Sequence, residues 1–354
     1  MKRILTIVGA RPQFIKAAAL SHTIRCMEGI IEEDILHTGQ HYDKDMSDNF
    51  FTELDIPAPK YNLSVGSASH GQQTAKMLCG IEEVLTTNHY DGVIIYGDTN
   101  STLAGALATA KLKIPVYHVE AGLRSFNRAM PEELNRVVAD HLSTLLFAPT
   151  KTAMNNLSHE GFPSKQCIFS GDVMLDNIIH YSPLASLHFP PSTFVLATLH
   201  RDFNTDHPER LNNILSTLNT LSEQFGSDIL FPIHPRTRNI IESSKYTPLC
   251  SHIHVVPPLS YLETLAALQR AKLVLTDSGG LQKEAYFCGK PCVILRPETE
   301  WVEIVDDGAA ILADADPKRI LDAASQLWNL VPNKPVQFGD GHAAETIVKH
   351  ILNQ

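Results

Sequence analysis

Three acidic side chains in the first half of the chain lie where groups that transfer protons are expected. Asp98 comes directly after the apolar run VIIYG, and Glu120 ends the run IPVYHVE. Glu132 follows Pro131 at the start of a helical pattern. The two runs read as parallel strands joined by an Ala- and Leu-rich helix, and the carboxyl ends of such strands open on one crevice. We therefore expect Asp98 and Glu120 to face one pocket and Glu132 to reach it.

Each of these acids also fits a structural role. Asp98 stands directly before the Thr-Asn-Ser sequence of a helix start, and Glu132 follows a proline at another. Acids are common in both places because they cap helices and complement the helix dipole. The convergence of three titratable groups on one crevice favours the catalytic interpretation.

Two cations flank the start of the first predicted helix. Arg11 and Lys16 follow the strand predicted over residues 4–9. Cations at a helix N-terminus are electrostatically unfavourable unless an anion is bound there. We therefore expect these two side chains to contact an anionic substrate.

A second candidate anion site is the sequence Ser278-Gly279-Gly280, which follows an apolar strand and opens a helix. Its glycines allow backbone N–H groups to approach phosphate oxygens. Glu284, one turn further on, could accept hydrogen bonds from a ribose. The alternative is a plain tight turn with Glu284 on a solvated face. Because neither G-x-G-x-x-G nor a P-loop sequence occurs, the pattern favours a nucleotide as substrate and not as redox cofactor.

Histidines end two strands predicted in the second half of the chain. His200 ends the strand over 194–201, and His234 the strand over 228–235. We expect His234 to contact uridine or phosphate. His37, His41 and His118 are expected to be structural, because buried imidazoles commonly serve as hydrogen-bonding groups.

Strand and helix patterns alternate almost throughout, which is typical of parallel, doubly wound sheets. A segment with three prolines, residues 180–193, interrupts this alternation and is the best candidate linker. The sequence predicts an α/β fold with two Rossmann-like doubly wound domains facing a cleft. We place the domains at residues 1–182, joined by a terminal helix over 339–354, and at 183–338.

Composition excludes several classes of protein. The 354 residues provide two domains of ordinary size, and a hydrophobic fraction of 44% with 19% charged residues is typical of a soluble globular protein. A net charge of −10 argues against nucleic acid or an anionic membrane as partner. No apolar run is long enough to span a membrane. The six cysteines lack the spacing of a metal site, so we expect small core residues and a reducing, cytoplasmic location.

Seven segments together resemble motifs of the non-hydrolysing UDP-N-acetylglucosamine 2-epimerases. In order, they are GARPQFIK, TGQHYD, YGDTNST, HVEAGLRS, MPEELNR, ATLHRDFNTD and TDSGGLQKEA. The resemblance runs from residue 4 to about residue 303. It implies a fold like that of the GT-B glycosyltransferases, a homodimer, no metal and no cofactor. The implied reaction is anti elimination of UDP from a UDP-2-acetamido sugar, then re-addition after C2 is reprotonated on its other face.

The resemblance also assigns roles, position by position. Asp98, Glu120 and Glu132 match the catalytic acids of the family, and His200 matches its catalytic histidine. The residues expected to bind substrate are Arg11, Lys16, Arg136, His234, Ser278, Gly279, Gly280 and Glu284. The chemistry agrees, because the weakly acidic C2–H needs a positioned carboxylate and the leaving diphosphate needs cations and N–H donors. Which acid removes the proton and which returns it stays open.

Besides Asp202-Phe203, which replaces the Ala-Glu often found after the His-Arg, the chain departs from the common family pattern at two motifs. It has ARPQF where many members have TRPEA, and TEWVE, with Trp301, where many have TERPE. Both versions resemble the subgroup that acts on UDP-2,3-diacetamido-2,3-dideoxy-glucuronate, a precursor of surface polysaccharide. Arg124 and Arg128 could meet the carboxylate of such a substrate. Alternatively, they pair with Glu132 or Glu133.

Three other functions remain to be distinguished from a UDP-sugar 2-epimerase. They are a hydrolysing epimerase, a glycosyltransferase on the same fold, and a UDP-sugar-binding regulator. The acids argue against the regulator, because a pure anion binder gains nothing from carboxylates beside phosphate.

Overall fold

The computed structural model describes the chain apart from residues 41–50, 189–192, 234, 243–245 and 334. His41 and the predicted substrate contact His234 therefore lie outside the described residues. The chain forms two compact units. Unit 1 contains Met1–Ile179 and Val336–Gln354, and unit 2 contains His180–Pro335.

Unit 1 is built on a seven-stranded parallel sheet in the order β3-β2-β1-β4-β5-β6-β7. The strands are β1 (Lys2–Val8), β2 (Ile31–His37), β3 (Tyr61–Asn62), β4 (Gly92–Tyr96), β5 (Val116–Val119), β6 (Leu145–Ala148) and β7 (Cys167–Phe169). The helices are α1 (Arg11–Arg25), α3 (His70–Thr87), α4 (Asn100–Lys111), α5 (Pro131–Leu142), α6 (Lys151–His159), α7 (Val173–Tyr181) and α15 (Ala343–Leu352). The strand order reverses between β1 and β4, which is where ligands bind in open α/β sheets.

Unit 2 contains a six-stranded parallel sheet in the order β10-β9-β8-β11-β12-β13. Its strands are β8 (Phe194–Thr198), β9 (Ile229–Pro232), β10 (Ile253–Val256), β11 (Ala271–Thr276), β12 (Cys292–Ile294) and β13 (Ala310–Leu312). Its helices are α8 (Asp202–Thr205), α9 (Pro208–Phe225), α10 (Pro235–Glu242), α11 (Tyr261–Arg270), α12 (Gly279–Phe287), α13 (Val302–Asp306) and α14 (Pro317–Leu327). The predicted α/β class with two doubly wound sheets is confirmed.

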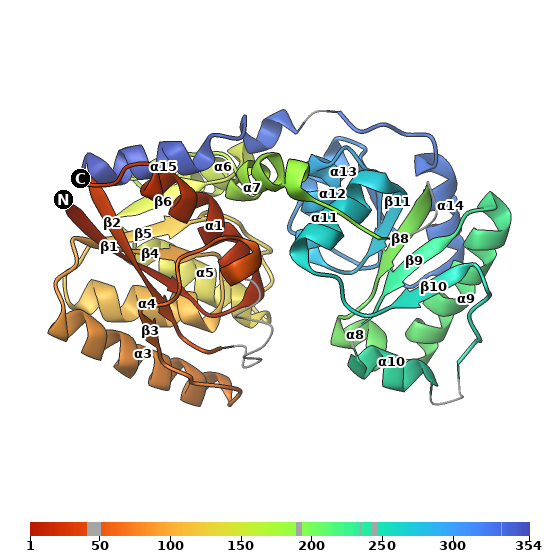
Figure 1. Cartoon of the computed structure of the whole chain (residues 1–354), viewed down its shortest axis with the longest axis horizontal. Helices are drawn as coiled ribbons and strands as arrows, with labels where there is room; N and C mark the ends of the chain where they lie inside the picture. The colour runs from red at the N-terminus through yellow and green to blue at the C-terminus, as the bar shows by residue number, and fades with distance from the viewer. Residues whose placement is uncertain (41–50, 189–192, 234, 243–245, 334) are drawn as a thin grey trace. The chain divides into compact units, whose positions relative to one another are not determined.

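Apolar strands with both faces covered account for these two cores. Every residue of β4, GVIIY, is buried, and helices flank each sheet (Figure 1). Such continuous apolar runs are typical of parallel strands. Cys292 is buried as expected, but Cys26 and Cys79 are exposed, so the prediction of core cysteines is wrong for those two. Among the described residues, no helix has the length and apolar character needed to cross a membrane.

The last helix of the chain returns to unit 1. Helix α15 packs against α1 (Figure 1). Its N-terminus meets a carboxylate of α7. The two oxygens of Asp176 accept the backbone N–H groups of Ala343, at 3.1 Å, and of Ala344, at 2.8 Å. Burial raises the pKa of Asp176 to about 6, although both N–H groups act to lower it. The folded chain therefore holds this proton more tightly than the unfolded chain does.

This pKa predicts how the stability of unit 1 depends on pH. A carboxyl group whose pKa is raised by folding stabilises the protein less as the pH rises from about 4 through about 6. In Asp176→Asn, which cannot ionise, this contribution is absent. We expect the difference in unfolding free energy between wild type and variant to change by on the order of 2 kcal/mol across that range, measured by urea unfolding. Exposed Glu82→Gln on α3 is the control, and parallel pH profiles for wild type and Asp176→Asn would contradict the assignment.

Candidate functional site

Asp98 and Glu120 leave neighbouring strands at the same edge of the unit 1 sheet. Tyr96, the last residue of β4, pairs with Val119, the last residue of β5. Gly97 follows with a positive φ of 61°, and Glu120 has a φ of 70°, which is unusual for a residue with a side chain. The first turn of α4 is capped by Thr99 and not by Asp98, because the Thr99 side chain accepts the Thr102 N–H. The structural alternative for Asp98 is therefore not realised.

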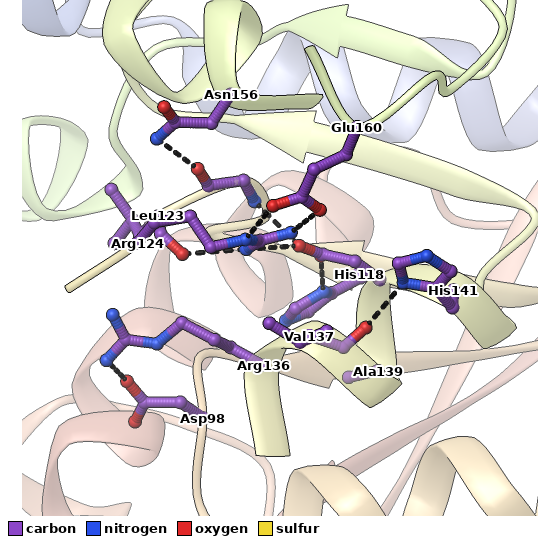
Figure 2. A network of polar contacts seen from close by, with 12 residues as sticks. Asp98, His118, Leu123, Arg124, Arg136, Val137, Ala139, His141, Asn156 and Glu160 are labelled. Atoms are coloured by element: carbon purple, nitrogen blue, oxygen red, sulfur yellow. Dashed lines mark hydrogen bonds and ion pairs between the residues drawn. The ribbon is translucent and has the colours of Figure 1, made fainter. Parts of the chain in front are cut away.

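Each of these two acids is paired with a cation from a different helix. The Lys16 ammonium of α1 contacts a carboxylate oxygen of Glu120. The Arg136 guanidinium of α5 contacts a carboxylate oxygen of Asp98, as Figure 2 shows. Burial raises the pKa of Asp98, Arg136 and Lys16 act to lower it, and Glu120 raises it further. The four side chains thus form one electrostatically coupled group, the acid–cation cluster of Lys16, Asp98, Glu120 and Arg136. Its Asp98 side chain is 32% exposed and remains open to a ligand.

The structure links Glu133, and not Glu132, to this cluster. Glu132 is half-buried in the first turn of α5 and makes no hydrogen bond or ion pair within the described part of the chain. Glu133 accepts the backbone N–H groups of Ser125, at 2.9 Å, and Phe126, at 3.0 Å. It also lies 3.3 Å from Nη1 of Arg136. The i,i+3 spacing of Glu133 and Arg136 was the available sequence signal for this pair. The role of Glu132 stays a prediction.

The loop between β1 and α1 is anchored by Gln13. Its Oε1 accepts the N–H groups of Gly9, at 2.9 Å, and Ala10, at 3.2 Å, while its Nε2 donates to the Tyr96 carbonyl at 2.9 Å. Sequence reasoning noted this residue only as a departure from the family pattern. A glutamate in its place would lack the N–H that binds the end of β4. Gln13 thereby sets the start of α1, where Arg11 lies, against the strand that carries Asp98.

In unit 2, a buried carboxylate orients His200. The Asp277 side chain is fully buried and accepts the backbone N–H groups of His200 and Arg201, at 3.0 to 3.2 Å. It also accepts Nδ2 of Asn204 at 3.1 Å and lies 3.1 Å from Nδ1 of His200. Burial raises the pKa of Asp277, but these donors outweigh burial and hold the pKa below its usual value. The His200 ring is 48% exposed, so the pair presents an oriented imidazole to solvent.

The predicted glycine turn opens α12 directly after this carboxylate. Ser278 is the N-cap, and its hydroxyl accepts the Leu281 N–H at 3.4 Å. A Cβ on Gly279 would lie 2.4 Å from Glu300, whereas one on Gly280 would meet only the Ser278 hydroxyl, at 4.0 Å. Glu284 lies one turn further on and is buried. The exposed part of this helix N-terminus is at Gly280, where backbone N–H groups suit an anion, while Gly279 is buried beside Glu300.

Trp301, which differs from the family pattern, is buried under a lysine beside this turn. The Lys283 ammonium lies 4.0 Å from the centre of the Trp301 ring, a cation–π contact. An arginine at this position would instead place a second cation next to Lys283. Trp301 therefore suits the lysine beside it better than the arginine found in many members of the family.

The pairing expected of Arg124 is wrong. Arg124 does not pair with Glu132 or Glu133, because its guanidinium is buried between Asp140, at 2.7 Å, and Glu160, at 2.6 Å. Arg128 is exposed. Among the described residues, no three His, Cys, Asp or Glu side chains gather as a metal ion would require.

Comparison with known proteins identifies the family. The sequence pattern of the family described as UDP-N-acetylglucosamine 2-epimerase matches residues 26–352. This chain belongs to that family. The predicted resemblance and the predicted isomerase class are thereby confirmed, and so is the GT-B-like pairing of two Rossmann-like sheets.

Individual relatives of this epimerase match it over almost its full length. The UDP-2,3-diacetamido-2,3-dideoxy-D-glucuronate 2-epimerase of Pseudomonas aeruginosa is 46% identical over 99% of both chains. A UDP-N-acetylglucosamine 2-epimerase homolog of Methanococcus maripaludis is 47% identical, also over 99% of both. The crystal structure of the Methanocaldococcus jannaschii UDP-GlcNAc 2-epimerase in complex with UDP-GlcNAc and UDP is 39% identical. It has a TM-score of 0.87 and covers 99% of this chain and 100% of its own.

Gly97→Ala tests the packing of the acid–cation cluster in this epimerase. An added Cβ would lie 3.1 Å from Oε2 of Glu120 and 3.2 Å from Nζ of Lys16, so the pair must move. We expect kcat for the UDP-sugar to fall by on the order of 10², because small displacements of reacting groups are costly. The control is Gly29→Ala, which has a similar positive φ of 82° but nothing within 4 Å. Equal losses of activity in both variants would show that backbone strain alone is responsible.

Asp277→Asn tests the carboxylate that orients His200. All four groups around Asp277 donate hydrogen bonds, so the amide nitrogen of asparagine would face a donor. We expect the unfolding free energy of unit 2 to fall by about 1–3 kcal/mol and the activity of the epimerase to fall with it. Asp316→Asn is the control, because Asp316 caps α14 and asparagine caps helices equally well. Urea unfolding of both variants makes the comparison, and equal stability of the two would contradict this role.

Proposed function

We propose that this chain is a non-hydrolysing epimerase that inverts C2 of a UDP-2-acetamido sugar. The reaction would eliminate UDP to give a 2-acetamidoglucal and then add UDP back after C2 is reprotonated on its other face. The observation that carries the proposal is the acid–cation cluster, in which Asp98 and Glu120 leave adjacent strands, each beside a cation. Two carboxylates at one sheet edge suit a reaction that removes and returns a proton on opposite faces of one carbon.

The residues of the cluster divide the chemistry between them. One carboxylate takes the C2 proton, and Glu132 is proposed as a third acid that reaches the sugar. Lys16 and Arg136, with Arg11, would bind the negative charge of the substrate diphosphate. A phosphate that pairs with Lys16 competes with Glu120 for the same ammonium, so substrate binding would release that carboxylate to act as a base. This coupling makes Glu120 reactive only when an anion is present.

Residues of unit 2 are proposed to bind and stabilise UDP. The exposed imidazole of His200 and the N–H groups at Ser278, Gly279 and Gly280 suit the charge that develops on the leaving diphosphate. Glu284 is proposed to accept hydrogen bonds from the ribose, and His234 is proposed as a further contact to UDP.

The first candidate substrate is UDP-N-acetylglucosamine, with UDP-N-acetylmannosamine as product. The second is UDP-2,3-diacetamido-2,3-dideoxy-glucuronate, named for the 46% identical relative. The specific observation that favours it is Trp301, which stacks on Lys283 where many members of the family have an arginine. Measuring kcat/KM with both UDP-sugars decides between them, since a single altered contact in the binding site changes this ratio by about tenfold or more.

Proton exchange with solvent tests the reaction itself. In D₂O, wild type should place deuterium at C2 of both substrate and product. Glu120→Gln should lower the rate by on the order of 10²–10⁴ if that acid transfers protons, without weakening the binding of UDP. Glu82→Gln, exposed on α3, should behave as wild type.

The same experiment separates the rival functions. Steady release of free UDP and sugar would indicate a hydrolysing epimerase. A requirement for an acceptor without exchange at C2 would indicate a glycosyltransferase. Binding of UDP-sugar with no turnover at all would indicate a regulator.

We also propose that the enzyme is a cytoplasmic homodimer. The homodimer rests on the resemblance to the family, and the location is supported by six cysteines that are free thiols. Sedimentation of the purified chain at twice its monomer mass would support the dimer, and a single monomeric species would contradict it.

A further inference from the structure

His118 lies fully buried in β5, with both ring nitrogens in short contacts. Its Nε2 lies 2.8 Å from the backbone carbonyl oxygen of Gly97. Its Nδ1 lies 2.7 Å from a carboxylate oxygen of Asp140, which comes from α5 (Figure 2). A carbonyl oxygen only accepts hydrogen bonds, so Nε2 must carry a hydrogen. The contact with Asp140 then requires a second proton, either on Nδ1 or on the carboxyl group.

The surroundings of Asp140 locate that second proton on the imidazole. Its other oxygen lies 2.7 Å from the Arg124 guanidinium and accepts the Gly122 N–H at 3.1 Å. Burial raises the pKa of Asp140, but the contacts from His118 and Arg124 outweigh burial and lower it. The Cys167 thiol also faces this group, and burial together with the charge of Asp140 raises its pKa, so it stays neutral.

Arg124 links this group to Glu160, whose side chain is 29% exposed. The guanidinium forms a two-point contact with Glu160, at 2.6 and 2.7 Å (Figure 2). With His118 and Arg124 as cations and Asp140 and Glu160 as anions, the group is neutral.

This group holds both turns that carry the acids. Through His118 it binds the Gly97 carbonyl, one residue before Asp98. Through Asp140 it binds the Gly122 N–H, two residues after Glu120. The Gly122 carbonyl in turn accepts Nδ2 of Asn156 at 3.0 Å. A histidine with a purely structural role needs only one hydrogen bond to the backbone. The contacts of this group instead join two strand ends, and the spacing of those ends decides where the acids lie.

We propose that His118 and Asp140 form a positioning pair for the epimerisation, in which doubly protonated His118 fixes the turn before Asp98 and Asp140 fixes the turn after Glu120. Neither residue contacts reacting atoms. The inference rests on the proposed function and adds to it two residues that act through the placement of the acids.

Two isosteric substitutions separate the two contacts of His118. In His118→Gln the amide nitrogen takes the place of Nε2 and keeps the bond to Gly97. In His118→Asn it takes the place of Nδ1 and keeps the bond to Asp140 but loses Gly97. Each variant removes one buried hydrogen bond, so both should lose similar stability.

The kinetic result should differ between these variants. We expect His118→Asn to lower kcat for the UDP-sugar by on the order of 10–100-fold with KM changed less than about threefold, and His118→Gln to stay within about fivefold of wild type. The control is Ser143→Ala, which removes a buried hydrogen bond to Ala139 at the end of α5 without touching either turn. Equal loss of kcat in both His118 variants, or loss in Ser143→Ala as large as in His118→Asn, would overturn the positioning role.

The protonation state has its own test, which does not depend on activity. In protein labelled with ¹⁵N-histidine, the signals missing from His118→Gln belong to His118. At pH 7 we expect both ring nitrogens to show the shifts of a protonated imidazolium. One unprotonated nitrogen at that pH would overturn the inference. If wild type instead fails to exchange C2–H in D₂O, the proposed function fails, whereas this spectrum still tests the pair.

Discussion

The pairing of each acid with a cation at the edge of the unit 1 sheet is the constraint on which the site depends. A carboxylate held among packed side chains loses solvation, and a nearby positive charge favours its ionised form. Lys16 and Arg136 supply that charge for Glu120 and Asp98 from helices on different parts of the sheet. The packing of α1 and α5 against the sheet therefore decides whether a carboxylate base is available.

Both units use a buried aspartate to hold a histidine, with opposite outcomes. In unit 2, Asp277 accepts backbone N–H groups and leaves the His200 ring exposed, so the imidazole faces outward. In unit 1, Asp140 holds His118 completely inside, and the second ring nitrogen serves the backbone. The same chemical pair therefore exposes an imidazole to solvent in one unit and joins two turns in the other.

The sequence predicted the strands that end at Asp98 and Glu120, because buried parallel strands are continuous apolar runs between turn residues. It could not predict the roles of Glu133 and Asp140, because α5 buries charged residues and exposes apolar ones. Glu133, Arg136 and Asp140 lie at i, i+3 and i+7 on its buried face, whereas Leu134 and Val138 are exposed. A prediction from hydrophobicity alone would place the wrong face of this helix against the core. Gln13 and Asp277 escaped prediction for a related reason, since their partners are backbone groups brought together only by the fold.

The return of α15 to unit 1 has a consequence for how the chain is made. Its buried side chains Ile347, Val348 and Ile351 belong to the first unit but are synthesised only after the whole of unit 2. At a synthesis rate of roughly 5–20 residues per second, unit 1 waits many seconds for its final helix while unit 2 is already being completed. The second unit in the sequence is therefore the first that can fold completely. During that interval the surface of α1 that α15 covers is the part of the nascent chain most in need of protection.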